Sequence, residues 1–194
     1  SGELSILITR ACGAHLASTR VETPDPKSTM VRTPELRALW TKVSRTSGDA
    51  AHPDANERLR GYTTALKNAG IPFDAQLVVS GDYQVDSGLK ATDHLLASRR
   101  KFTALFTAND QMAYGAALSL HRKGLKIPGD VSLIGFDDLY HSIYVAPPLS
   151  TIHQPAYELG RLTASAILQM LADTKPTAVM PAPKLIVRES TAKP

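Results

Sequence analysis

The chain has 194 residues, of which 43% are hydrophobic and 21% are charged. This composition is typical of a soluble globular protein and excludes a disordered chain. No apolar run approaches the roughly 20 residues that a membrane-spanning helix needs, and Leu4–Ile8 is too short for the core of a signal peptide. The single cysteine, Cys12, excludes an internal disulfide, so the sequence favours a cytoplasmic setting and no membrane association.

The net charge of +4 is unevenly distributed along the chain. Residues 1–48 carry seven basic and four acidic side chains, a balance of +3, whereas residues 49–194 carry fifteen and fourteen, a balance of +1. A DNA-binding surface needs clustered cations that displace counterions from phosphates. We therefore expect that most of this chain does not bind DNA.

Predicted helices and strands alternate from residue 54 onward. Apolar residues three and four apart predict helices, and short apolar runs predict strands. The resulting order is helix 54–69, strand 76–80, helix 85–97, strand 104–107, helix 110–123 and strand 131–135. Because each connection between strands contains a helix, we expect right-handed βαβ units and a parallel sheet with helices on both faces.

The pattern changes after the third predicted strand. Prolines bracket Ala146–Pro155, which favours an extended segment that crosses out of the sheet. A long helix over 156–172 follows, and then a last strand, Leu185–Val187. Its apolar spacing predicts that this helix buries one face, formed by Leu159, Leu162, Ala166, Ile167 and Met170. We infer a chain that leaves one lobe, enters another and returns.

Residues 1–48 do not follow this alternation. A strand over 4–9 and a short helix over 34–42 are predicted there, separated by a polar segment that contains prolines. The predicted organisation is a remnant or divergent part of a first lobe over 1–48 and an α/β lobe over 49–151. The chain is then predicted to return to the first lobe over 152–183 and to end with a final strand and tail over 184–194.

Polar side chains follow each of the three predicted strands. In open parallel sheets, ligands bind beyond the carboxyl ends of the strands, which here selects Gly81–Tyr83, Ala108–Asp110 and Gly135–Asp138, with Asp137 the favoured ligand contact. Carboxylate, amide and aromatic groups together suit a polyhydroxylated or heterocyclic ligand. Asp110 is favoured as a helix cap over a ligand contact, both roles remain open for Asn109, and Asp138 is favoured as structural.

Arg58 lies in the first turn of its predicted helix, near the same end of the sheet. A guanidinium can bind two ligand oxygens, although the residues alone favour a solvated helix face. The six histidines lack the spacing of metal ligands, so we expect no metal and no cofactor. Catalytic motifs such as Gly-x-Ser-x-Gly and Gly-x-Gly-x-x-Gly are absent, which favours binding over catalysis.

Six segments in order, covering about 145 residues from Ser47 onward, resemble the regulatory domain of the lactose/galactose-repressor (LacI/GalR) family of bacterial transcription regulators. They are Asp54–Tyr62, Gly81–Tyr83, Thr107–Ala116, Val131–Asp138, Pro147–Pro155 and Leu185–Thr191. The resemblance implies two α/β lobes of the periplasmic-binding-protein-like type, the first of them incomplete here. It also implies a homodimer that senses a sugar, sugar phosphate or nucleobase-like effector.

The resemblance further implies effector contacts for Arg58, Asn109 and Asp137, and weaker ones for Asp54 and Tyr83. The family's helix-turn-helix, which places a recognition helix in the major groove, does not match any part of this chain. We therefore expect operator DNA to be bound only through such a head. If the first lobe is incomplete, uncovered apolar surface on helix 156–172 favours association and weaker effector binding.

Two other functions are compatible with an α/β sheet of this kind. An exported sugar-binding protein of a transport system would share the fold, but Thr151–Pro155 and Arg188–Ser190 are typical of regulators. A small enzyme on a doubly wound sheet is disfavoured because the sequence offers no nucleophile beside a base.

Overall fold

The computed structural model of the chain describes residues 43–47, 53–177, 179 and 181–192. Its main feature is a four-stranded sheet in the order β2-β1-β3-β4, in which all neighbouring strands are parallel. The strands are β1 (Val43–Ser47), β2 (Val78–Ser80), β3 (Ala104–Thr107) and β4 (Ser132–Ile134). We call residues 43–47 and 53–150 the sheet lobe.

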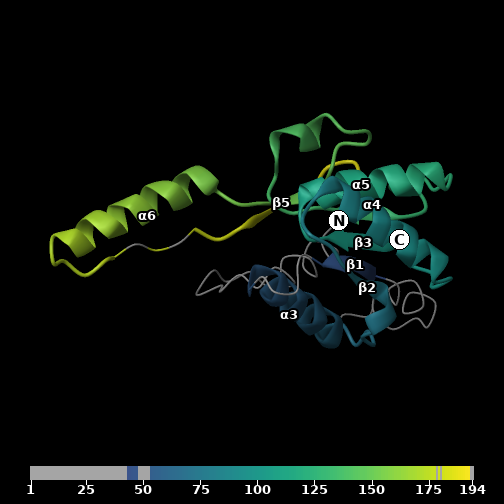
Figure 1. Cartoon of the computed structure of the whole chain (residues 1–194), viewed down its shortest axis with the longest axis horizontal. Coiled ribbons are helices and arrows are strands. Elements are labelled where there is room, and N and C mark those ends of the chain that lie inside the picture. Colours follow the sequence, from purple (N-terminus) through teal and green to yellow (C-terminus); the bar gives the residue numbers. More distant parts are fainter. Residues whose placement is uncertain (1–42, 48–52, 178, 180, 193–194) are drawn as a thin grey trace, which may run out of the picture.

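Helices connect these strands and cover both faces of the sheet. Helix α3 (Pro53–Asn68) lies on one face, and α4 (Val85–Ala97) and α5 (Asp110–Arg122) lie together on the other (Figure 1). Successive side chains of a strand point to opposite faces. Leu105 of β3 accordingly packs with Leu95 of α4 and Leu120 of α5, whereas Phe106 belongs to a different cluster. The predicted parallel, doubly wound α/β arrangement is confirmed.

The predicted boundaries agree closely with the structure. Helix 85–97 and strand 104–107 have the predicted bounds, and most other elements differ by one or two residues at an end, which is the usual uncertainty of helix and strand ends. The strand predicted over 76–80 is instead a 3₁₀ turn, η2 (Ala75–Leu77), followed by β2. Asp74 accounts for this, because its side chain accepts a hydrogen bond from the Gln76 amide and caps the turn.

Strand β1 was not predicted. It pairs with both β2 and β3, so it is an interior strand of the sheet although it precedes the boundary predicted between residues 48 and 49. Only one of its five residues, Val43, is strongly apolar, so the apolar pattern gave no signal. The strand predicted over 4–9 and the helix predicted over 34–42 lie outside the described residues.

Two crossing strands, β5 (Thr151–His153) and β6 (Lys184–Ile186), form a separate antiparallel pair. They leave from the free edge of β4, where the amide of Gly135 donates to the carbonyl of Ser150 at 2.9 Å. Between them lies helix α6 (Ala156–Leu171), which projects away from the sheet (Figure 1). We call residues 154–177, 179 and 181–183 the arm. The predicted extended crossing is confirmed in β5.

The predicted burial of one face of α6 is wrong in the described structure. None of its residues is buried, and Ile167 and Met170 from the predicted face are exposed. The amphipathic pattern identifies the apolar face of a helix correctly, but burial requires an element that packs against that face. The arm extends beyond the sheet lobe and lacks such contact among the described residues.

Candidate functional site

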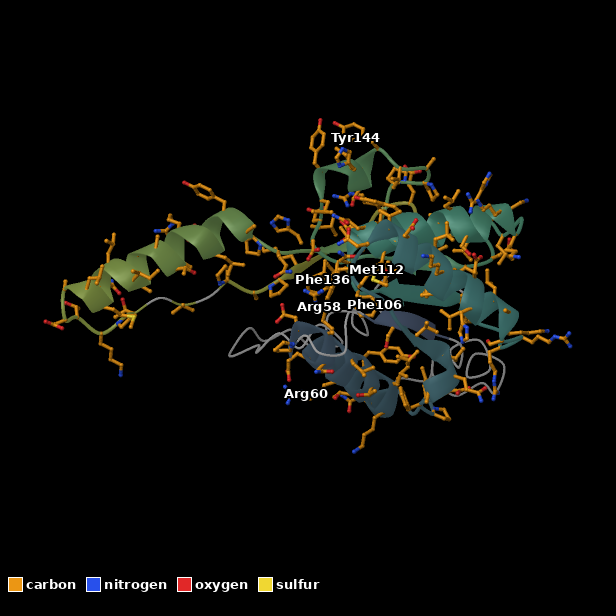
Figure 2. The ribbon with its side chains drawn as sticks, viewed as in Figure 1. Arg58, Arg60, Phe106, Met112, Phe136 and Tyr144 are labelled. Atoms are coloured by element: carbon orange, nitrogen blue, oxygen red, sulfur yellow. The ribbon has the colours of Figure 1, made fainter. Side chains whose placement is uncertain are left out.

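The candidate site lies at the carboxyl edge of the parallel sheet. Tyr83 follows β2, Asn109 follows β3 and Asp137 follows β4, so the three loops meet at one edge. Helix α3 directs Arg58 toward this edge, beside Phe136 and Phe106, whereas Arg60 of the same helix points away (Figure 2). The sequence prediction that Arg58, Tyr83, Asn109 and Asp137 converge is therefore supported by their placement.

Arg58 is held in a defined position. Its Nη1 donates a hydrogen bond to the carbonyl oxygen of Ala108 at 2.7 Å. Its guanidinium carbon lies 3.9 Å from the centre of the Phe136 ring and 5.9 Å from that of Tyr83. A guanidinium over an aromatic face is stabilised by about 0.5–2 kcal/mol, more when water is excluded. Arg58 is thus a preorganised cation at the site, with further N–H donors in its planar fork.

The ring beneath Arg58 belongs to an apolar cluster at the end of the sheet. Phe136 packs with Phe106 of β3, Ile134 of β4 and Ile152 of β5, and Leu185 of β6 lies against them. The cluster therefore joins the sheet lobe to both crossing strands. Because its residues come from four separate segments, the position of Phe136, and with it of Arg58, depends on how the crossing strands pack.

Asp137 supplies the negative charge of the site. Its amide donates to the carbonyl of Ile152 at 2.8 Å, and its Oδ1 accepts from Gln154 Nε2 at 3.0 Å. Burial raises the pKa of Asp137, and the Gln154 hydrogen bond and the Arg58 cation oppose that rise. Asp137 directly follows Phe136, whose ring lies under the Arg58 guanidinium, so a carboxylate and a cation lie at the same edge of the sheet.

The turn that carries Asp137 has unusual backbone geometry. Asp137 has φ 108° and Asp138 has φ 60°, both in the left-handed region. Such conformations cost non-glycine residues about 1–3 kcal/mol each and persist only where the surroundings enforce them. Strained residues of this kind concentrate at functional sites, which agrees with the position of Asp137 at the sheet edge.

Asn109 caps α5, and Asp110 does not. The Oδ1 of Asn109 accepts a hydrogen bond from the amide of Met112 at 2.9 Å, and its Nδ2 donates to the carbonyl of Tyr83 at 2.9 Å. The prediction that Asp110 is a helix cap is wrong, because its carboxylate points instead to Leu139, Ser142 and Thr151. Asn109 thus joins the loops after β2 and β3.

Asp138 has the structural role that the sequence analysis favoured. Its Oδ1 accepts from Arg188 Nη2 at 2.6 Å, and its Oδ2 lies 2.9 Å from His153 Nδ1. Arg188 also donates to the carbonyl of Leu149 at 2.7 Å. This cluster of Asp138, His153 and Arg188 ties the end of the sheet to β5 and to the segment that follows β6.

Asp54 is the outermost of the predicted site residues. It lies in the first turn of α3, four residues before Arg58 and therefore on the same side of the helix. Its side chain is exposed. Phe136 lies in the predicted segment Gly135–Asp138, whereas Gln154, which donates to Asp137, was not predicted as a site residue although it lies in a segment that carried the family resemblance. The only signal for Gln154 was its place in the extended segment Ala146–Pro155, which was predicted to cross out of the sheet.

The described part of the chain holds neither a cluster of metal-ligating side chains nor a helix of membrane-spanning length and apolarity. Across residues 43–47, 53–177, 179 and 181–192, histidine, cysteine and carboxylate side chains form no group of three or more that could hold a metal ion. Within the same residues, no helix is long and apolar enough to cross a membrane.

Comparison with known proteins identifies the family. Residues 38–191 match the model of the periplasmic binding protein-like domain. The chain belongs to this family. The sequence resembles repressors named PurR: it is 35% identical over 158 residues to the one from Photorhabdus laumondii and 35% identical over 160 residues to the one from Yersinia pestis. These matches cover 80–81% of this chain but 44–45% of the relatives, so the chain spans about half their length.

Solved structures of LacI-family regulators share this fold. A sugar-binding regulator from Escherichia coli, complexed with phosphate, is 33% identical with a TM-score of 0.73, over 82% of this chain and 58% of that one. A dimeric Lac repressor is 30% identical with a TM-score of 0.74, over 82% and 59%. The regulator CelR bound to cellobiose is 32% identical with a TM-score of 0.73, over 77% and 46%. The resemblance to the LacI/GalR effector-binding domain is confirmed.

Proposed function

We propose that this chain is the effector-sensing part of a transcriptional regulator and binds a sugar at the carboxyl edge of its sheet. The observation that carries the proposal is the convergence of Arg58, Asn109 and Asp137 from α3 and two strand ends. Sugar hydroxyls donate to a carboxylate and accept from a guanidinium or an amide, so this set fits a polyhydroxylated ligand. The nearby Phe136 and Tyr83 rings offer apolar faces of the kind found in small-molecule sites.

Two of the similar solved structures support a sugar as the effector. One similar structure is described as a sugar-binding regulator and another as a cellobiose complex. The PurR relatives and the dimeric Lac repressor are named as repressors, which supports regulation over transport or catalysis. We propose Tyr83 and Asp54 as secondary contacts, because Tyr83 faces Arg58 while Asp54 lies at the exposed rim.

The proposal is tested in two steps. A thermal-shift panel of monosaccharides, cellobiose, sugar phosphates and hypoxanthine first identifies a compound that stabilises the chain. Calorimetry with that compound then compares the wild type with Arg58→Ala and Asp137→Asn. A hydrogen bond to a charged group contributes about 1.5–3 kcal/mol, so each substitution should weaken binding about 10- to 100-fold.

Arg60→Ala is the matched control for Arg58→Ala. Arg60 lies on the same helix, forms an exposed ion pair with Glu57 and points away from the site (Figure 2). Its substitution should leave affinity unchanged. Equal affinity for wild type, Arg58→Ala and Asp137→Asn would rule out this site, and a preference for hypoxanthine would replace the sugar with a nucleobase.

We also propose that effector binding controls operator binding by a separate helix-turn-helix of the regulator, since the matched PurR relatives are named as repressors of that type. Residues 49–194 carry a net charge of only +1, which is too little for a phosphate-binding surface of their own. Fluorescence anisotropy at physiological salt should show no sequence-dependent DNA binding by the 194-residue chain. Nanomolar, sequence-dependent binding would contradict this assignment.

The homodimer is proposed to form through the η3 patch, which comprises Leu118 of α5 and Tyr140, Ile143 and Tyr144 in and after the turn η3 (Tyr140–Ile143). All four side chains are exposed, and Tyr144 is 65% exposed on the outer side of the sheet lobe (Figure 2). Tyr114 lies one turn before Leu118 and joins α5 to η3 through a 2.8 Å hydrogen bond with Ser142. Exposed aromatic patches on a rigid base are typical of protein interfaces.

Light scattering distinguishes the η3 patch from the apolar face of α6 as the dimer contact. Tyr144→Asp should convert the dimer to a monomer, whereas Leu168→Asp on α6 should not. The reverse result would assign association to α6, and a monomeric wild type would exclude the homodimer.

A further inference from the structure

Asp110 is a buried carboxylate that the proposed binding site does not use directly. Its side chain accepts three hydrogen bonds: from Thr151 Oγ1 on Oδ1 at 2.5 Å, and from Ser142 Oγ at 2.5 Å and the Leu139 amide at 2.8 Å on Oδ2. Asp110, Ser142 and Thr151 are all fully buried. A fully buried charge is costly unless it is satisfied in this way. Its location therefore requires a structural explanation.

These hydrogen bonds surround the strained turn that carries Asp137. The amide of Asp110 donates to the carbonyl of Phe136 at 2.8 Å, immediately before the turn, and its carboxylate binds the amide of Leu139, immediately after it. Thr151, held by the same carboxylate, accepts from the Asp138 amide at 3.3 Å. Asp110 thus contacts the turn on both sides of the two left-handed residues.

The close packing around Asp110 leaves its carboxylate little room to adopt another position. A Cβ added to Gly135 would lie 2.1 Å from Asp110 Oδ1, so the glycine allows the carboxylate to approach the end of β4. Ser142 gives its single hydroxyl proton to Asp110, so Tyr114 must donate to Ser142 across their 2.8 Å contact. Burial raises the pKa of Asp110, and the Ser142 and Thr151 hydrogen bonds oppose that rise.

We propose that Asp110 is the positioning residue of the effector site, because its carboxylate fixes the turn Phe136–Leu139 in the conformation that presents Asp137. Through the same carboxylate, the turn is tied to β5 by Thr151 and to η3 by Ser142. The position of Asp137 therefore depends on both of those segments. Only the ligand readout of this inference rests on the proposed function; the conformation of the turn does not.

Hydrogen exchange of backbone amides in the ligand-free, full chain tests the conformational part. Thr151→Val removes one hydroxyl donor while keeping the shape of the side chain, and Asp110→Asn alters the acceptor itself. Both substitutions should accelerate exchange about tenfold at Asp137 and Leu139, but not at Leu95 and Leu120 in the helices. Thr151→Ser keeps the hydroxyl and should retain slow exchange in the turn.

Thr92→Val is the matched control, because Thr92 is another fully buried threonine whose hydroxyl binds the Gly88 carbonyl within α4. It should leave exchange in the turn unchanged. Calorimetry with cellobiose, or whichever panel compound binds the wild type, should show about tenfold weaker binding for Thr151→Val, which corresponds to about 1.4 kcal/mol. Binding by Thr151→Ser should be restored, even if its melting temperature is lower than that of Thr151→Val.

Three results would overturn the proposal: unchanged exchange in the turn, equal acceleration across the whole chain, or wild-type affinity in Thr151→Val despite a loosened turn. If no compound binds the wild type, the proposed function fails. Local acceleration that Thr151→Ser rescues would still support the role of Asp110 in fixing the turn.

Discussion

The sheet lobe and the arm contain equally regular helices in different surroundings. Helix α4 buries Gly88, Ala91, Thr92 and Leu95 against α5 and the sheet. Helix α6 is longer, with 16 residues against 13, yet none of its residues is buried. Since a helix is stabilised mainly by packing of its apolar face, we expect substitutions of the same kind to have different effects in the two regions.

The largest difference should come from removing an apolar side chain. Leu105 of β3 is 0% exposed and packs between α4 and α5, so Leu105→Ala should lower the free energy of unfolding by about 2–5 kcal/mol. Leu168 of α6 is 66% exposed, so Leu168→Ala should change the free energy of unfolding by less than about 0.5 kcal/mol. Urea unfolding followed by circular dichroism measures both. A loss above about 1 kcal/mol for Leu168→Ala would show that α6 is packed in solution.

A smaller difference should come from adding a methyl group to a helical glycine. A Cβ at Gly115 of α5 would lie 1.9 Å from the Val85 carbonyl oxygen, so Gly115→Ala must push α4 and α5 apart. We expect a loss of about 1–3 kcal/mol in the free energy of unfolding.

Gly160 of α6 provides the matched substitution. A Cβ there meets no atom within 4 Å, so Gly160→Ala should instead increase the stability of the helix by about 0.5–1 kcal/mol through its higher helix propensity. Thermal unfolding monitored by circular dichroism should show opposite signs. Tolerance of Gly115→Ala would indicate that the two helices separate easily and would contradict the close packing.

The same contrast explains what the sequence predicted well. Helix 85–97 and strand 104–107 were located correctly because periodicity and turn residues are local signals. The shared position of Asn109 and Asp137 followed from the rule that parallel strands end at one edge, whereas Arg58 was selected by the family resemblance. The apolar face of α6 was recognised and predicted to be buried, with exposure expected only if the first lobe is incomplete, because a helical pattern does not specify which element will cover it.

Other features depend on contacts between distant residues and gave no local signal. Strand β1 has few apolar residues and is placed by backbone pairing with β2 and β3. The ring contact between Arg58 and Phe136 joins α3 to the end of β4. The Asp110 hydrogen bonds to Leu139, Ser142 and Thr151 span 29 to 41 residues. These interactions could be identified only from the three-dimensional structure.

The smallest expected difference concerns how two carboxyl groups, one in each region, respond to pH. Burial raises the pKa of Asp137 above its ordinary value of 3.8. Protonation of Asp137 therefore stabilises the folded state fully below pH 3.8. This stabilisation is lost as the pH rises through the higher pKa that Asp137 has in the folded state. The free energy of unfolding of wild type, relative to Asp137→Asn, should accordingly increase between pH 7 and pH 3.5.

Glu158 of α6 should behave in the opposite way. Its hydrogen bonds with Arg161 lower the pKa of its carboxyl from the ordinary value of 4.5. The stabilisation from the ionised form is present above that value and is lost as the pH falls through the lower folded pKa. Relative to Glu158→Gln, wild type should therefore lose helical stability on acidification.

Because the Glu158–Arg161 pair is on the surface, the effect should be small and should weaken further in 0.5 M salt. Urea titrations at pH 7 and pH 3.5, with and without salt, measure the pH effect for both carboxyl groups. If acidification changed stability in the same direction for Asp137 and Glu158, the contrast between a buried site and an exposed arm would be contradicted.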